Sequence, residues 1–437
     1  MINDFKLNLG SVINNNVEKA AGKDLFIERA IHKEIDFDTY LFLIDTVETV
    51  DVSDRFVDVI KTFDVREGIT PAGFRIEYTV KNGNELVIDL VRDISYGENG
   101  LKRPTNVIFS ADSANPYEIE PIKDLIGNLT CNPGIIYDLF INNPKANIDG
   151  KFKTRDEVMM EIGRILGPGC DISVELNNPY APIEELLKEA AHFKEMLSEY
   201  RVVIKVPHTG PMNNKTIGQL LIGDKTFESR YNQGKTEDFL RGHNVALRLQ
   251  EEGYRVNFTL MFEPYQTALA LQAKPYFINS FVRHRLIQSN NIQAFLGAYE
   301  ASKNPNYLTQ LREYLVKNDH FPISMKDQDL LSIKEYAENL IDYRQFETVG
   351  ADGLDSVRHN LRVLKQCNLP DTRLIICSME GPNNYPDLDR LLTEEEFKDM
   401  VGKVVITAEP NYLAQFTSTN QVVTYQRRFM NAAAGQK

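Results

Sequence analysis

The sequence contains no tryptophan, only four cysteines and no long apolar run. The cysteines, Cys131, Cys170, Cys367 and Cys377, form no Cys-x-x-Cys pair, which argues against a zinc site and against a disulfide framework. No stretch approaches the roughly 20 apolar residues of a membrane-spanning helix. The N-terminus, Met-Ile-Asn-Asp-Phe-Lys, lacks the basic and apolar regions of a secretory signal. We therefore expect a cytoplasmic protein with no membrane partner.

Basic residues are the minority among the charged ones. The chain has 49 Lys and Arg against 62 Asp and Glu, a formal net charge of -13, and no basic cluster, which argues against nucleic acid as a partner. Its seven histidines show no His-x-x-His or His-Glu-x-x-His spacing, so we expect no metal and no other cofactor. A length of 437 residues with 42% hydrophobic content accommodates one large α/β domain and a smaller one.

The first hundred residues differ in pattern from the remainder. The expected elements are two helices, Ile27–Ile35 and Asp54–Phe63, and two strands, Phe74–Val80 and Glu85–Val91. Asn82-Gly83 between the strands is a hairpin signal, because both residues tolerate positive φ. We expect an α+β accessory domain at residues 1–100, before a junction at 97–104. A dimerisation element, a lid and a stability cap are all compatible with it.

From residue 101 to 437, short apolar strands alternate with longer helical stretches, which is typical of βα units and a parallel sheet. Two of the helices are expected at Pro182–Tyr200 and Asn244–Gly253. The eight expected strands are Val107–Ser110, Asn128–Cys131, Asp171–Leu176, Val202–Val206, Val256–Leu260, Tyr276–Phe281, Leu374–Cys377 and Val404–Thr407. This pattern favours an α/β fold of the closed (β/α)8, TIM-barrel type, although an open doubly wound sheet is also compatible with periodicity.

Two insertions are longer than βα connections require. Residues 210–242 follow the fourth strand and are placed to act as a lid over the barrel mouth. Residues 286–369 have helical periodicity at Tyr307–Val316 and Leu330–Tyr343. The second insertion could complete a pocket, form a contact in a homo-oligomer or add helical packing.

The fourth strand contains a lysine in an apolar setting, Val202-Val203-Ile204-Lys205-Val206-Pro207. Lysine is almost never fully buried unless it is paired, and burial disfavours its charged form. A neutral lysine attacks carbonyl groups and forms a Schiff base. The alternative is a lysine at a strand end whose ammonium reaches water.

Polar residues recur where the other expected strands end, which is the face where barrel active sites are built. Asp112, Asn132, Glu175, Asn257 and Thr259 all occupy such positions, and Asn257 and Thr259 share a strand face. Each has an ordinary alternative as a cap, turn former, strand filler or rim carboxylate. A lysine, two carboxylates and two amides together form a set of groups that imine chemistry can use.

Six strand motifs resemble those of transaldolases and the related fructose-6-phosphate aldolases, in the same order, from about residue 106 to 417. They are Asp112-Ser113-Ala114, Thr130-Cys131-Asn132-Pro133, Ser173-Val174-Glu175, Ile204-Lys205-Val206-Pro207, Asn257-Phe258-Thr259-Leu260-Met261-Phe262 and Ser280-Phe281-Val282. The resemblance implies a metal-free class I enzyme of carbohydrate metabolism. Such an enzyme cleaves a ketose next to its carbonyl and passes a dihydroxyacetone unit to an aldehyde acceptor.

The resemblance also implies a role for each matching residue. Lys205 is the Schiff-base nucleophile, and Glu175 is the general acid/base acting through a water held by Thr259. Asp112 takes and returns the proton of the substrate hydroxyl. The hydroxyls of the dihydroxyacetone unit are bound by Asn132 and Asn257.

The phosphate-binding motifs depart from the family pattern. The sixth strand continues as Ser280-Phe281-Val282-Arg283-His284-Arg285. An arginine therefore stands one residue before and one residue after the expected position, but not at that position. The seventh-strand motif reads Ser378-Met379-Glu380, with a carboxylate in place of a cation, and a like charge opposite a phosphate costs on the order of 3 kcal/mol. We expect a substrate that lacks the usual phosphate or carries its anion against Arg283 or Arg285. Glu380 could instead bind hydroxyls or an amine, or be a misaligned rim residue.

Three functions remain in view. The first is a transaldolase-like transferase acting on a sugar or a sugar-phosphate-like substrate, with Ser280, Arg283, Arg285, Ser378 and Glu380 as further candidate substrate-binding residues. The second is a class I aldolase, a lyase that releases the free ketone. The third is a non-catalytic barrel that binds a sugar.

Overall fold

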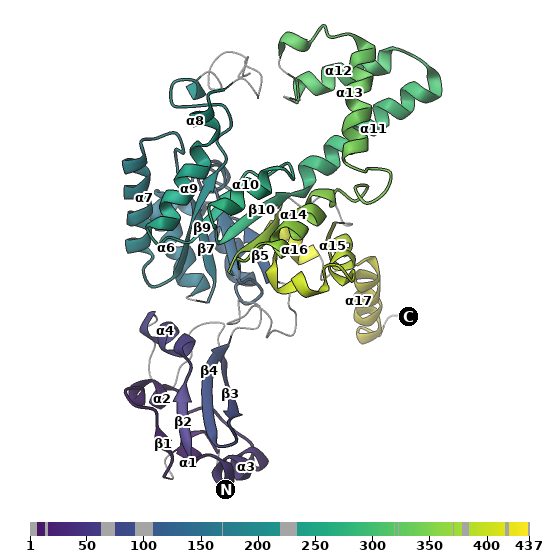
Figure 1. Cartoon of the computed structure of the whole chain (residues 1–437). Helices are drawn as coiled ribbons and strands as arrows, with labels where there is room; N and C mark the ends of the chain where they lie inside the picture. The colour runs from purple at the N-terminus through teal and green to yellow at the C-terminus, as the bar shows by residue number, and fades with distance from the viewer. Residues whose placement is uncertain are drawn as a thin grey trace. The chain divides into compact units, whose positions relative to one another are not determined.

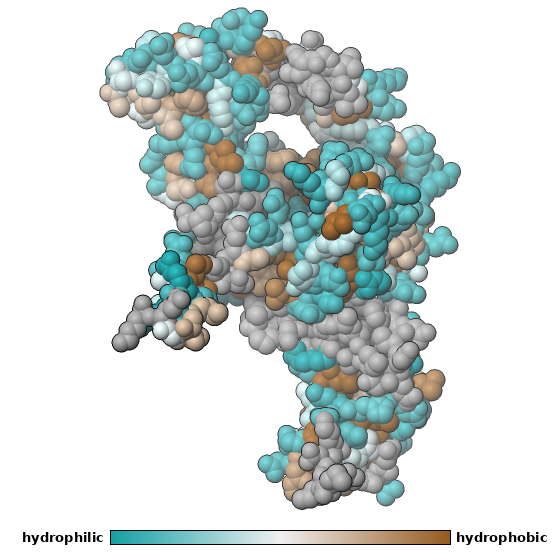
Figure 2. Space-filling view, turned by 180° about the vertical axis from the view of Figure 1, so that it is seen from behind, coloured by the Kyte–Doolittle hydropathy of each residue, from teal (hydrophilic) through white to brown (hydrophobic). Residues whose placement is uncertain are grey.

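The computed structural model describes residues 7–13, 16–62, 75–91, 108–167, 169–218, 234–318, 320–321, 323–369, 371–377, 384–415 and 419–435. Within these ranges the strands form a four-stranded sheet near the N-terminus and a closed eight-stranded barrel (Figure 1). No described helix is long and apolar enough to cross a membrane. Teal, hydrophilic residues predominate on the described surface in Figure 2, with smaller brown areas between them.

The N-terminal region is a small α+β unit, as predicted. Its sheet has the order β1-β2-β4-β3, in which only the β3–β4 pair is antiparallel. The hairpin between β3 and β4 has positive φ at Asn82 and Gly83, which confirms the turn signal. Leu86, Ile88 and Leu90 alternate along β4 and are buried against the helices. The elements are α1 (Gly10–Ile13), β1 (Glu18–Lys19), α2 (Asp24–Ala30), α3 (Phe37–Thr46), β2 (Thr49–Val52), α4 (Asp54–Thr62), β3 (Arg75–Lys81) and β4 (Glu85–Val91).

The barrel confirms the predicted (β/α)8 fold, and each of the eight expected strands is present to within two residues at either end. The barrel order is β10-β11-β12-β5-β6-β7-β8-β9, so sequence neighbours are spatial neighbours throughout. Every barrel residue of β11 and β12 is buried, as expected for a parallel sheet covered by helices. The strands are β5 (Ile108–Asp112), β6 (Asn128–Cys131), β7 (Asp171–Glu175), β8 (Arg201–Pro207), β9 (Val256–Thr259), β10 (Phe277–Phe281), β11 (Arg373–Cys377) and β12 (Val404–Ala408).

Some of the helices of the barrel region begin at a recognisable capping signal. For example, Thr154 and Glu157 form a capping box at the start of the helix that precedes β7. The longer helices of this group are η2 (Gly134–Ile141), α6 (Arg155–Leu166), α7 (Ile183–Met196), α9 (Arg241–Glu251), α10 (Gln266–Gln272), α14 (Asp355–Gln366), α15 (Asn384–Thr393) and α17 (Asn420–Ala433). The shorter ones are α5 (Pro116–Ile119), η1 (Glu120–Ile122), η3 (Ile148–Gly150), α8 (Thr236–Phe239), η6 (Lys398–Lys403) and α16 (Pro410–Gln415).

The second insertion is a group of three helices with its own core. They are α11 (Val282–Ser302), α12 (Asn306–Lys317) and α13 (Leu330–Tyr343), with η5 (Ile323–Met325) between the last two (Figure 1). Leu311, Leu315 and Ile333 are fully buried between these helices. The predicted periodicity at 307–316 and 330–343 is therefore confirmed, whereas the sequence pattern did not predict the 21-residue α11.

Buried ion pairs join this insertion to the barrel. Arg285, at the start of α11, pairs with Glu263 after β9 and with Asp355 at the start of α14. Arg344, after α13, lies 3.1 Å from the other oxygen of Glu263 and donates to Ser289 of α11 at 3.0 Å. Both guanidinium side chains are almost fully buried, at 1% and 2% exposure. Glu263 is thus the shared anion of two buried cations.

Replacing Glu263 by glutamine should therefore destabilise the protein strongly. The variant keeps the side-chain shape but removes the negative charge that two buried guanidiniums share. We expect the free energy of unfolding to fall by about 3–5 kcal/mol as a result. Urea unfolding followed by circular dichroism measures it. Glu338→Gln, which breaks the exposed pair with Lys334, is the matched control and should cost at most about 1 kcal/mol. Equal losses in the two variants would contradict a structural role for the buried pairs.

Candidate active site

The candidate residues on β6, β7, β8 and β9 belong to one compact unit of the chain, made of residues 130–133, 173–192 and 203–437. Glu175 is the last residue of β7, Lys205 lies in β8 and Thr259 is the last residue of β9. Because parallel strands share a direction, their carboxyl ends meet at one end of the barrel. Lys205 stands level with Asn257 in the β8–β9 register.

Lys205 and Glu175 form a buried ion pair. The Nζ atom of Lys205 is 3.2 Å from Oε2 of Glu175, and the two side chains are only 8% and 13% exposed. Lys205 is therefore not directed to bulk solvent, and the alternative of a lysine whose ammonium reaches water does not apply. The amine of Lys205 and the carboxylate of Glu175 are therefore adjacent.

Next to this pair runs a row of hydrogen-bonded polar side chains from three strands. The amide of Asn257 donates to the hydroxyl of Ser173 at 3.2 Å. The amide of Asn279 in turn donates to the Asn257 oxygen at 2.7 Å. Since Ser173 and Asn279 lie on β7 and β10, this row spans the inside of the barrel on either side of β8 and β9. Asn257 is fully buried, and its orientation is fixed by both contacts.

The end of β9 carries an unsatisfied hydroxyl and an unusual backbone turn. Thr259 is 1% exposed, and its Oγ1 has no hydrogen-bond partner among the described residues. A buried hydroxyl without a partner is costly, and a water or substrate group would satisfy it. The next residue, Leu260, has a φ of 60°, a conformation rare for a branched side chain. Gln266 holds this turn by donating to the Leu260 carbonyl at 3.0 Å and accepting from the Phe262 amide at 2.8 Å.

The segment after β8 returns to the same end of the barrel. Asn213 donates to the Asp238 carboxylate at 2.9 Å, and the Gly242 amide donates to the Thr209 hydroxyl at 3.2 Å. A Cβ at Gly242 would lie 2.4 Å from the carbonyl of Pro207, so only glycine allows α9 to approach β8 this closely. The described ends of the 210–242 insertion are therefore joined above the strand of Lys205. Residues 219–233, on which the lid expectation also depends, lie outside the described part.

The other predicted site residues are placed as follows. Asp112 is the half-buried last residue of β5, and Asn132 is half-buried directly after β6. Ser378 and Glu380 lie outside the described residues. Arg283 is exposed on the first turn of α11.

Two predicted substrate-binding residues are engaged elsewhere. The Ser280 hydroxyl lies 3.2 Å from that of Ser356 and accepts from Asn360 at 3.2 Å, both on α14, so this side chain faces the helix layer. Arg285 is held in the buried ion pairs with Glu263 and Asp355. We therefore leave Ser280 and Arg285 out of the substrate-binding set.

Sequence reasoning missed the residues that support the site. Asn279 points into the barrel, where the motif match would place its neighbour Ser280. Side chains alternate along β10, so Asn279 shares a face with the buried Phe277, and this alternation was the signal for its orientation. Gln266, which positions the β9 turn, gives no recognisable signal in the sequence. Among the described residues, no group of three or more His, Cys, Asp or Glu side chains is arranged to hold a metal ion.

The model of a family described as Transaldolase/Fructose-6-phosphate aldolase matches residues 109–434. The matched region covers the barrel strands from the second residue of β5 onward and includes the helical insertion. A search of curated proteins gave no match. The matched region begins after the N-terminal α+β unit.

Acid should weaken the packing next to the site through His208, directly after β8. Its ring stacks on Phe258 at 4.2 Å, and burial, with a smaller contribution from His243, lowers the pKa of His208 to about 4. The unfolded chain, whose histidine pKa is near 6.5, binds this proton first as the pH falls. The stabilisation is therefore complete above pH 6.5 and is lost by about pH 4, a change of roughly 3 kcal/mol.

Urea unfolding at several pH values between 7 and 4 tests this assignment. His208→Gln should lose less stability over that range than the wild type does. His32→Gln, at an exposed position in the N-terminal unit, should behave as the wild type. Identical pH profiles for His208→Gln and the wild type would refute the role of His208.

Proposed function

Because the chain belongs to the transaldolase/fructose-6-phosphate aldolase family, whose enzymes use aldolase-type Schiff-base chemistry, we propose that it is a transaldolase-like transferase acting through Lys205. The observation that carries this proposal is the Lys205–Glu175 pair, a buried amine 3.2 Å from a carboxylate at the carboxyl end of the barrel. A binding-only barrel has no use for this arrangement. The substrate is a ketose with a dihydroxyacetone-type end, and the acceptor is an aldehyde.

Glu175 supports the proton transfers of imine formation. It first accepts a proton from the lysine, which releases a neutral amine. The amine then adds to the ketone carbon, and one of its protons passes through Glu175 to the carbonyl oxygen. The hydroxyl formed in this way receives a further proton from Glu175 and departs as water. Thr259 has the free hydroxyl to hold that water. The Schiff base that results keeps one N–H proton, and in the hydrolytic direction water adds to it and the same groups transfer the protons in the reverse order.

Carbon–carbon cleavage requires a second base. We assign this to Asp112, which takes the proton of the substrate hydroxyl as the aldehyde leaves and returns it when the acceptor aldehyde is attacked. Asn132 binds the hydroxyls of the three-carbon unit from the end of β6. The fixed amide row of Asn257 and Asn279 supports the same unit from within the barrel.

Transfer, rather than release, of the three-carbon unit is supported by the pair of carboxylates. Glu175 and Asp112 correspond to the transaldolase branch, whereas the aldolase branch has a glutamine and tyrosine arrangement. The alternative is a lyase that releases the free ketone. In either case the phosphate site is atypical, because the seventh-strand position carries Glu380 and because Arg285 is already neutralised by Glu263 and Asp355. Arg283 is the remaining candidate from the sixth-strand motif.

Trapping tests the Schiff base directly. The protein is incubated with fructose 6-phosphate or dihydroxyacetone, reduced with borohydride, digested and analysed by mass spectrometry. We expect the reduced adduct on the peptide that contains Lys205 and no adduct in Lys205→Met. In Glu175→Gln the adduct should form at least about 100-fold more slowly, because the proton shuttle is lost. Circular dichroism verifies that both variants fold. Without an adduct on the wild-type peptide, the sugar-binding alternative would stand instead.

The acceptor dependence separates the transferase from the lyase. With a ketose donor alone, a transferase should release about one equivalent of aldehyde per active site and then stop at the Lys205 adduct. Addition of glyceraldehyde as acceptor should restore multiple turnovers. Product aldehyde is measured with a coupled dehydrogenase. Continuous turnover and accumulation of free dihydroxyacetone in the absence of acceptor would assign the lyase reaction.

A further inference from the structure

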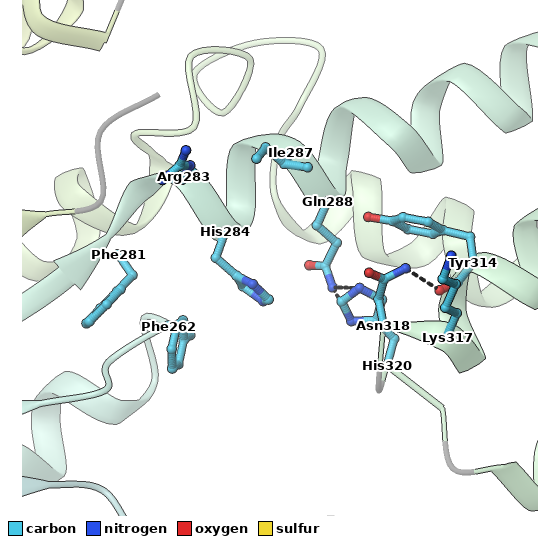
Figure 3. A pocket seen from close by; sticks show the side chains of 10 residues that line it. All are labelled: Phe262, Phe281, Arg283, His284, Ile287, Gln288, Tyr314, Lys317, Asn318 and His320. Atoms are coloured by element: carbon cyan, nitrogen blue, oxygen red, sulfur yellow. Dashed lines mark hydrogen bonds between the residues drawn. The ribbon is translucent and has the colours of Figure 1, made fainter. Parts of the chain in front are cut away.

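Two surface features lie outside the catalytic set, and only one of them is separate from the barrel mouth. The first is a cavity of about 610 Å³ between the helical insertion and the ends of two barrel strands (Figure 3). Its barrel wall contains Phe262, three residues beyond Thr259, and Phe281, the last residue of β10, so we regard it as part of that mouth. The second feature belongs to the N-terminal unit, which precedes the matched family region.

This second feature is the outer edge of the N-terminal sheet. The strand order β1-β2-β4-β3 places β3 at one end, with β4 on one side and no described strand on the other (Figure 1). β3 is seven residues long, from Arg75 to Lys81, and it pairs with β4 over its full length without a bulge. An edge strand presents its outward N–H and C=O groups to a strand that lies beside it. A long and regular edge of this kind is therefore suited to pair with another strand.

The helix-facing side chains of β3 are incompletely covered. Tyr78 and Val80 lie directly opposite Ile88 and Leu86 of β4 and share their face of the sheet. Ile88 and Leu86 are fully buried, whereas Tyr78 and Val80 are only partly buried. The cover that the helices provide thus ends close to β3. A further strand beside β3 would bring its own side chains against these two and bury them.

The opposite face of β3 is polar and carries both signs of charge. Glu77, Thr79 and Lys81 alternate with the apolar residues and are exposed. Glu77 contacts Arg75 of the same strand, and an exposed pair of this kind contributes little to stability. Along the edge, an anion and a cation therefore stand four residues apart with Thr79 midway between them. A second β3 that runs antiparallel presents the same charges in the reverse order.

One antiparallel register of two β3 strands is complementary on both faces. When Thr79 lies opposite Thr79 of a second copy, Glu77 lies opposite Lys81, and this pair of opposite charges occurs twice. On the other face, Tyr78 lies opposite Val80, also twice. Because every residue faces one of the same parity, the residues whose backbone groups point outward meet each other in this register.

The neighbouring registers fit less well. With Tyr78 opposite itself, Arg75 lies opposite Lys81, and with Glu77 opposite itself two carboxylates meet. Like charges directly opposite each other on a sheet are destabilising. Registers centred nearer the strand ends overlap by only three residues, whereas the register centred on Thr79 overlaps by five. The charges of β3 thus favour one pairing and disfavour the others.

We propose that β3 is a dimerisation edge, which pairs antiparallel with β3 of a second copy of this chain about a two-fold axis at Thr79. The pairing joins two four-stranded sheets into one, and the symmetry closes the assembly at two copies. Among the roles that the sequence leaves open for residues 1–100, it selects the dimerisation element. It uses none of the proposed catalytic residues, so it does not depend on the reaction assigned above.

Charge reversal tests this pairing in the full-length chain. Glu77→Lys and Lys81→Glu should each weaken dimerisation at least about tenfold, because each sets two like-charge pairs across the two copies. An equimolar mixture of these two variants should dimerise as the wild type does, because both pairs are again of opposite sign. Asp38→Lys, at an exposed position of α3, makes the same charge change as Glu77→Lys and should have no effect.

Sedimentation velocity between about 1 and 200 µM measures the dimerisation, a range that suits a small and reversible interface. Circular dichroism verifies that each variant folds. A cysteine at the axis gives a second readout. Thr79→Cys should form a disulfide-linked dimer under mild oxidation, because the two side chains lie directly opposite each other. Asp38→Cys is the matched control and should remain monomeric on a non-reducing gel.

Three results would overturn the proposal. Dimerisation that both charge reversals leave unchanged would place the contact on another surface. Loss of dimerisation in both variants without recovery in their mixture would exclude the antiparallel register. A wild-type chain that stays monomeric at the highest concentration, with no Thr79→Cys cross-link, would leave the edge of β3 to an extended segment of a different protein.

Discussion

The proposed chemistry depends on one lysine and one glutamate side chain that are removed from water together. Taking either ion alone into the barrel would cost several kcal/mol, and the pairing of Lys205 with Glu175 offsets much of that cost. Burial and pairing together place the Lys205 amine beside a group that can accept its proton, which is the arrangement that the proposed lysine nucleophile requires.

Hydrogen bonds at the barrel mouth hold the side chains next to this pair in fixed orientations. Asn257 is held between Ser173 and Asn279, so three strands around Lys205 are tied together by side chains as well as by the sheet. By contrast, the Thr259 hydroxyl has no described partner. In a site where most polar atoms are satisfied, an unsatisfied one marks where a water or a substrate group is expected.

The sequence predicted what depends on periodicity. Alternation and turn signals predicted the eight barrel strands and the N-terminal hairpin, and the structure contains them. The ends of these strands predicted that Lys205 and Glu175 lie near each other, and they do. It failed where the answer depends on a shift of one residue or on distant partners. Ser280 and Asn279 face opposite sides of β10, and a motif match cannot decide which one enters the barrel. Gln266 acts through contacts that form only in the folded turn.

Arg283 and Arg285 show why the expectation of an anion site could not be assessed from the sequence alone. Residues two apart on a helix point in nearly opposite directions, so on α11 only one of them can face the barrel layer. The carboxylates of Glu263 and Asp355 lie on the side of Arg285, which acts as a structural cation, whereas Arg283 lies on the exposed side of the helix. The buried pairs also fix α11 against the β9 turn that carries Phe262. The ion pairs that attach the insertion therefore also hold the first turns of α11 in place, so any change to them should lower the stability of the protein.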